Sequence, residues 1–306
     1  MIEAAYVGSV GNNIHGRVPF NPAQFIDDPI TGAPPSEGNA SDRVIYEPGI
    51  LGATNRIMEN FAHSNYSALE IQGTKRFGHG STILANYTRA RSQDANATNN
   101  NNANVPNPFN LRAGYGPSDF DRRDSFVVSW LYVLPIHFSN SIANSLLSGW
   151  TLTAIQTVES GTPITFYSGQ DVALDGTGEQ QYAQLKPGAT ASTVRISHPS
   201  REAEVNEFFN TQAFVPTSNE PLGIYGNASK GFISGPAYAN TDASLLKDFT
   251  LPQSFRLQFR LESFNTFNQV NFANPNSTVS SGAFGNIQST VAQTGRQLQL
   301  ALKLLW

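Results

Sequence analysis

The chain contains no cysteine, so it can form neither disulfide bonds nor thiolate metal sites. It also lacks any run of about 18 apolar residues, which excludes transmembrane helices. Its formal charge of −4 means that it has no excess of basic residues to bind phosphates, so we expect no nucleic-acid partner. A hydrophobic fraction of only 39% does not exclude a membrane barrel, because half of each barrel strand faces a polar lumen.

The last eleven residues, 296–306, carry the clearest pattern in the chain. Leu298, Leu300, Leu302, Leu304 and Trp306 share one parity, and the other parity is mainly polar, apart from an alanine and a final leucine. This alternation predicts a β-strand with one apolar face. A soluble edge strand of this kind would promote aggregation, whereas a strand facing lipid would not. We therefore interpret it as the closing strand of an outer-membrane barrel.

Seven further segments alternate in the same way or have a β-rich composition. The clearest of them carries phenylalanine and leucine on one face and arginine, glutamine and glutamate on the other. The fold class predicted is all-β, an antiparallel up-and-down transmembrane β-barrel portion of about eight strands. These strands are expected at 2–10, 66–77, 81–92, 122–134, 150–166, 241–249, 255–262 and 296–306.

The links between these segments alternate between long and shorter ones. The shorter links are 78–80, 135–149 and 251–254, and the long polar links are 11–65, 94–121, 167–240 and 266–293. In an up-and-down barrel, such alternation collects the long loops at one end and the short turns at the other. Bacterial outer-membrane barrels have this asymmetry, with long external loops and short periplasmic turns.

Aromatic residues lie beside the expected short turns and at the C-terminus, where an aromatic girdle is expected at the periplasmic interface. Lys75 is an exception to the apolar pattern, since it shares its parity with leucine and isoleucine. Either its side chain extends to the rim or a bulge shifts the register. The rim aromatics are Phe77, Trp150, Phe249, Phe255 and Trp306.

Several motifs resemble the C-terminal part of a TonB-dependent outer-membrane receptor barrel, especially the Oar-like group. The resemblance implies a barrel of about 22 strands around a plug, with the signal peptide, plug and energy-coupling box upstream. A TonB-type energy-coupling protein would then be a partner only through those upstream regions. The motifs are NYSALEIQGTKRF at 65–77, residues 80–88, DFDRRDSF at 119–126, GWTLTA at 149–154, SGTP at 160–163, RLESFNTFN at 260–268 and the terminal strand.

The N-terminus, beginning at Met1, has no basic region, apolar stretch or cleavage site of a signal peptide. An outer-membrane protein needs export. We therefore expect residues 1–306 to be the C-terminal part of a longer receptor-like barrel in the cell outer membrane. An open sheet of eight strands would leave two unpaired edges in lipid, and each unsatisfied backbone group there costs several kcal/mol.

Sequence motifs for catalysis and cofactor binding are not found, so we expect no enzyme and no cofactor. An acidic segment with Asp171, Asp175 and Glu179 does not match the spacing of an EF-hand, and we interpret it as a solvated external loop. Arginine and glutamate on the expected lumen face, Arg256, Arg260 and Glu262, either contact a solute or plug or simply line a wet lumen. The five histidines, at His15, His63, His79, His137 and His198, show no metal-ligand spacing.

The function expected is therefore binding or passage of a solute across the outer membrane. Two alternatives remain open: a surface adhesion or structural protein that uses the long polar loops, and a self-contained barrel of eight strands. The expected partners are outer-membrane lipid and the barrel-assembly machinery. The residues expected to form the assembly signal and the rim are Leu300, Leu302, Leu304, Trp306, Trp150 and Phe255.

Overall fold

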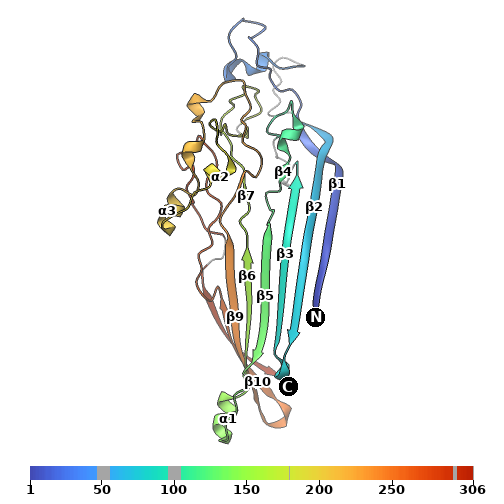
Figure 1. Cartoon of the computed structure of the whole chain (residues 1–306), viewed down its shortest axis with the longest axis vertical. Coiled ribbons are helices and arrows are strands. Elements are labelled where there is room, and N and C mark those ends of the chain that lie inside the picture. Colours follow the sequence, from blue (N-terminus) through green and yellow to red (C-terminus); the bar gives the residue numbers. More distant parts are fainter. Residues whose placement is uncertain (47–55, 96–104, 179, 292–294, 306) are drawn as a thin grey trace.

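Eight long strands form one antiparallel sheet in which each strand pairs with the next along the chain (Figure 1). The computed structural model describes residues 1–46, 56–95, 105–178, 180–291 and 295–305. The strands occur close to the expected positions, so the all-β meander is confirmed. They are β1 Ile2–Pro19, β2 Arg56–Arg76, β3 Thr82–Asp94, β5 Asp124–Val133, β6 Trp150–Glu159, β9 Tyr238–Thr250, β10 Arg256–Phe264 and β11 Gln297–Leu305.

The first two strands are longer than the sequence predicted. β1 continues to Pro19 and β2 begins at Arg56, so the predicted loop at 11–65 was wrong at both of its ends. The β1–β2 register shifts between Gly11 and Ile14, and again between Ile14 and Gly16. Each shift moves side chains to the other face of the sheet, which erases the alternation that reveals a strand in sequence.

The expected strand at 150–166 is shorter than predicted and ends at Glu159. Beyond it, Gly161 lies against the backbone of Gly235, where a Cβ on Gly161 would come within 1.9 Å of the carbonyl oxygen. This contact requires glycine and turns the chain away from the sheet. The chain then enters a separate two-stranded sheet of β7 Pro163–Ile164 and β8 Ile233–Ser234.

The turns at one end of the sheet are tight and the links at the other end are large (Figure 1). Two tight turns are the short 3-10 helices η2 Gly78–Gly80 and η6 Pro252–Ser254. Their central residues, His79 at φ 60° and Gln253 at φ 62°, adopt the left-handed conformation that reverses the chain within a few residues. The third link at this end contains α1 Ser141–Leu147.

The large links at the opposite end contain the remaining short elements. The main buried apolar cluster lies among these links, between residues 164 and 233, and not on the sheet. The short elements are β4 Gly116–Pro117, which pairs with β3, the helices α2 Ala191–Val194 and α3 Arg201–Asn206, and the 3-10 helices η1 Glu37–Asp42, η3 Leu111–Gly114, η4 Thr211–Ala213 and η5 Thr217–Asn219.

The sheet is open in the part of the chain that the structure describes. β1 pairs only with β2, and β11 pairs only with β10. Among the described residues, no helix has the length and apolar character needed to cross a membrane.

Candidate functional site

The sheet has one strongly apolar face, built from rows of side chains that cross from strand to strand. Because the strands pair in continuous register, Tyr132, Leu152, Leu245, Leu261 and Leu300 lie in one row across five strands. Neighbours in such a row lie about 4.5–5.5 Å apart at Cβ and pack together. With Leu300 70% exposed, this face has no protein covering at its β11 end.

The opposite face is polar along the same strands. On β10, Arg256, Gln258, Arg260 and Glu262 alternate with the apolar side chains. Arg260 forms an ion pair with Glu262 at 2.6 Å. The Gln258 amide also donates a hydrogen bond to Asp248 on β9 at 2.9 Å. Such a face requires water or polar groups against it, so the two faces of the sheet need different surroundings.

The expected rim aromatics that the structure describes all lie at the short-turn end, and they are Phe77, Trp150, Phe249 and Phe255. The Trp150 indole N–H donates to the carbonyl oxygen of Leu146 in α1 at 3.2 Å, and its ring meets the Phe259 ring edge-on at 5.9 Å between centroids. Phe255 directly precedes β10, and its carbonyl accepts a hydrogen bond from Leu251 at 2.8 Å. A ring in apolar surroundings with its N–H directed to a carbonyl at the edge is typical of a membrane interface.

Two lysines on the apolar face extend toward this same rim. Lys75 lies on the apolar face because the β2–β3 register continues unbroken from Ser64 to Arg76, so the alternative of a bulge there was wrong. Its ammonium lies 5.8 Å from the centroid of the Phe77 ring. Lys247 donates a hydrogen bond to the carbonyl of Ser148 and lies 5.2 Å from the Phe249 ring centroid. Both lysines therefore place their aliphatic stems along the apolar face and their charges near its edge.

The terminal strand has the expected alternation of faces but an unpaired outer edge in the described region. Leu300, Leu302 and Leu304 lie opposite Leu261, Phe259 and Leu257 of β10, all on the apolar face. Trp306 lies outside the described residues. The position of the three leucines thus agrees with a lipid-facing strand, while its role as an assembly signal stays a prediction.

The links at the other end form a folded unit, called here the outer cap, which comprises residues 160–235. Phe166, Phe209 and Phe214 are almost completely buried, and their rings contact one another at centroid distances of 4.6–5.9 Å. Aromatic clusters of this size contribute strongly to local stability. Sequence reasoning missed the cap, although the phenylalanines at 208, 209 and 214 were a local signal of a core.

A buried ion pair joins the outer cap to the sheet. The Lys230 ammonium lies 2.5 Å from a carboxylate oxygen of Asp94 at the end of β3, and both residues are buried. The second Asp94 oxygen accepts a hydrogen bond from the hydroxyl of Ser118. Buried charges are tolerated only when they are paired and hydrogen-bonded, and these are.

The link between β1 and β2 also contacts the outer cap. The buried guanidinium of Arg43 donates hydrogen bonds to the carbonyls of Gln24 and Ser36 within its own link and to Leu174 in the cap, the last at 2.9 Å. The backbone N–H of Ala23 donates to the carbonyl of Asp175 at 2.7 Å. Hydrogen bonds therefore connect the β1–β2 link to the outer cap beyond the end of the sheet.

The acidic segment of the cap is not the solvated loop that the sequence predicted. Asp175 is buried and accepts hydrogen bonds from the Tyr225 hydroxyl at 2.5 Å and from the Thr177 hydroxyl at 2.7 Å. Burial, and then the neighbouring Asp175, raise the pKa of Asp171 to about 6. Glu179 lies outside the described residues. Among the described residues, no group of three histidine or acidic side chains is placed to hold a metal ion.

A sheet with one apolar and one polar face and an aromatic rim is typical of outer-membrane barrels. The family described as an outer membrane beta barrel domain matches residues 1–299. The chain belongs to this family. The apolar face is accordingly the lipid-facing side and the polar face lines the lumen, which places the protein in the outer membrane. Comparisons with curated proteins and with solved structures found no significant match.

Proposed function

We propose that this chain forms part of the wall of an outer-membrane receptor or transporter barrel that binds a solute or lets it pass. The observation that best supports the proposal is the combination of a polar lumen face with a folded cap at its outer end. The motifs also resemble TonB-dependent receptors of the Oar-like group, and this resemblance supports transport that is driven by energy coupling. In that case a TonB-type energy-coupling protein acts through regions outside this chain.

The polar side chains on this face favour a water-filled lumen over an interior packed with side chains. Small barrels fill their interiors with side chains, whereas large barrels leave a channel or enclose a plug. Charged and amide side chains continue along β10, and the hydroxyls of Thr153 and Ser244 meet at 2.5 Å on the neighbouring strands. A solute or a plug would meet hydrogen-bonding groups along this wall.

The folded structure of the outer cap is an argument for ligand recognition at the cell surface. Its aromatic core and the buried pair of Lys230 and Asp94 give it one defined shape, and binding loops on a rigid scaffold are a common arrangement. We propose binding and not catalysis. Its carboxylates, Asp171 and Asp175, accept hydrogen bonds from the cap itself, which is a structural role. Asp94 of β3 likewise accepts a hydrogen bond from Lys230 of the cap.

Solute depletion tests the proposal. Cells that carry the intact gene, a deletion of it, or a deletion of the energy-coupling gene are grown in one defined mixture of solutes, and the medium is profiled by mass spectrometry. We expect at least one solute to be depleted only when both genes are present. Identical depletion profiles in all three strains would contradict transport.

Adhesion is the second candidate, and the independent core of the outer cap favours it, since a folded unit beyond the sheet offers a contact surface. Cells that lack residues 186–225 of the cap distinguish the two functions. Loss of attachment to surfaces or to other cells, with unchanged solute profiles, would support adhesion. Loss of solute depletion with unchanged attachment would support the receptor.

We also propose that β11 is the strand recognised by the barrel-assembly machinery. Its regular leucine face, Leu300, Leu302 and Leu304, ends next to Trp306. Replacing Trp306→Ser in the intact protein should lower the amount found folded in the outer membrane, measured by membrane fractionation. Leu251→Ser, which alters an exposed residue in a turn at the same rim, is the matched control. Equal insertion of both variants would contradict an assembly role.

A further inference from the structure

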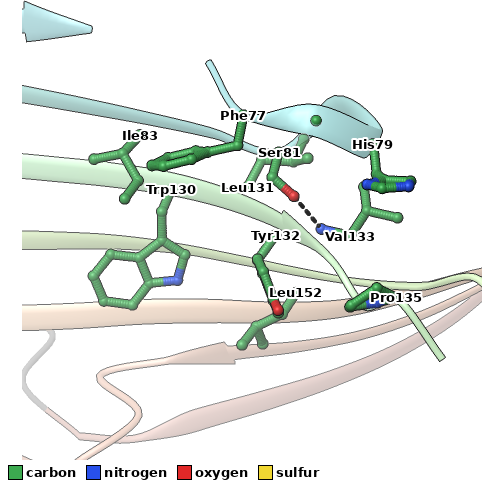
Figure 2. A pocket seen from close by; sticks show the side chains of 11 residues that line it. Phe77, His79, Ser81, Ile83, Trp130, Leu131, Tyr132, Val133, Pro135 and Leu152 are labelled. Carbon is green, nitrogen blue, oxygen red and sulfur yellow. Dashed lines mark hydrogen bonds between the residues drawn. The ribbon is translucent and has the colours of Figure 1, made fainter. Parts of the chain in front are cut away.

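A groove on the lipid-facing side lies at the short-turn end of the sheet. Its volume is about 540 Å³, within the range of about 300–1,000 Å³ that is usual for small-ligand sites. Figure 2 shows side chains from the β2–β3 turn, β5 and β6 around it. The main lining side chains are Phe77, Ile83, Trp130, Tyr132 and Leu152.

The lining of this groove combines apolar surface with unused hydrogen-bonding groups. Ile83 pairs with Trp130, and Tyr132 pairs with Leu152, so these four side chains share the apolar face. Within the described part of the chain, the Trp130 indole N–H and the Tyr132 hydroxyl have no hydrogen-bond partner in the protein. Aromatic residues of this kind lie at the level of lipid headgroups, where one end is apolar and the other is wet.

Positive charge lies at the edge of the groove. Lys75 is exposed and is the β-partner of Ile83, and its ammonium lies 5.8 Å from the centroid of the Phe77 ring that lines the groove. His79 lines the turn end of the groove, and an imidazole N–H can donate a hydrogen bond to a phosphate oxygen. An elongated apolar ligand with an anionic head fits this arrangement.

We propose that the groove binds a phospholipid from the periplasmic leaflet of the surrounding membrane. One acyl chain lies against Ile83, Trp130 and Leu152, and the phosphate lies near Lys75. The lipid is chosen over other apolar occupants because the groove is continuous with the lipid-facing surface and a cation stands at its edge. The proposal rests on the outer-membrane location and not on transport, so failure of the transport test leaves it standing.

Photo-crosslinking in outer-membrane vesicles tests this site. Vesicles that contain the intact protein receive phosphatidylglycerol with a diazirine in its acyl chain, and the crosslinked peptides are identified by mass spectrometry. We expect labelling to concentrate on peptides around Phe77–Ile83 and Trp130–Val133. Lys75→Glu should lower this labelling about fivefold, because one basic side chain near an anionic lipid contributes that order of affinity.

Two matched pairs of variants separate a specific site from general lipid contact. Arg76→Glu changes a cation that is also exposed but lies on the lumen face, and it should leave labelling unchanged. Leu152→Trp fills the groove and should lower labelling, while Leu300→Trp enlarges a lipid-facing side chain outside it and should not. Uniform labelling of the apolar face, or equal effects of Lys75→Glu and Arg76→Glu, would each overturn the proposal.

Discussion

Lys230 holds an almost completely buried positive charge, and its carboxylate partner, Asp94, is 136 residues away in sequence. The pair connects the outer cap directly to the end of β3. Nearby, Gly116 lies against the Lys230 backbone, where a Cβ would come within 2.9 Å of the carbonyl oxygen. The lysine is therefore enclosed on several sides, and its side chain is only 8% exposed.

Replacing Lys230→Met should loosen the cap strongly. Removing one partner leaves an unpaired buried carboxylate, which costs about 3–5 kcal/mol. Arg89→Met is the matched control, because Arg89 pairs with Asp124 at 3.1 Å with both side chains substantially exposed, and such surface pairs contribute about 0–1 kcal/mol. Hydrogen exchange of the 228–235 segment measures the difference. Equal protection in the two variants would contradict this account.

The carboxyl of Asp171 makes the stability of the cap depend on pH. Its pKa in the folded cap is raised from 3.8 to about 6, so the folded state binds the proton more tightly than the unfolded state does. The contribution of Asp171 to the stability of the cap is therefore fully present below about pH 4 and is lost as pH rises through about 6. The charged groups that face Asp171 are Asp175 and Arg43.

Hydrogen exchange of peptides containing Asp175 and Gly176, whose N–H groups donate to Asp171, measures this dependence after correction for intrinsic rates. We expect greater protection at pH 5 than at pH 7. Asp171→Asn should abolish the difference, because an amide does not titrate in this range, although it also replaces one acceptor by a donor. Greater protection at pH 7 in the unaltered protein would show that the sign is wrong.

At the scale of the element, successive residues of β11 face lipid and lumen in turn. Leu300 and Gln299 are neighbours, yet Leu300 faces Leu261 on the apolar side and Gln299 faces Glu262 on the polar side. The same substitution at these two positions should therefore change stability by very different amounts.

Leu300→Arg should destabilise the inserted protein by about 2–4 kcal/mol, the cost of a cation on the lipid face near the bilayer midplane. Gln299→Arg should have little effect, since the new guanidinium lies opposite a carboxylate in a wet lumen. Denaturant unfolding in lipid vesicles measures both variants. A similar loss of stability for the two would contradict the assignment of faces.

At the scale of the whole molecule, the orientation in the membrane follows from the two ends of the sheet (Figure 1). We expect the large links and the outer cap to lie on the external side, and α1 with the tight turns to lie on the periplasmic side, as in bacterial outer-membrane barrels. Leu222 in the cap is 59% exposed and Ile142 in α1 is 73% exposed, so both sites are accessible to a reagent in water.

Single cysteines test this orientation cleanly, because the chain has none of its own. Leu222→Cys should react with a membrane-impermeant maleimide on intact cells. Ile142→Cys should react only after the outer membrane is permeabilised. Labelling is measured by the mass shift of the purified protein, and the reverse pattern would show that the orientation is inverted.

The sequence alone determined the meander, the two faces of most strands, and the end at which the short turns lie. These features depend on local spacing: alternation in β10 and β11 is visible because each strand keeps one register from end to end. A turn such as Gly78–Gly80 is likewise defined within a few residues. Period two and turn length are properties of the chain itself.

Only the tertiary structure decided the outer half of β1 and β2, the outer cap and the groove. Register shifts at Ile14 remove the alternation, so pairing across the sheet is what makes those residues a strand. The burial of Lys230 by Asp94, like the buried state of Asp175, depends on contacts between distant segments. No local pattern encodes such contacts, because a buried charge and a solvated charge look alike in sequence until their partners are placed.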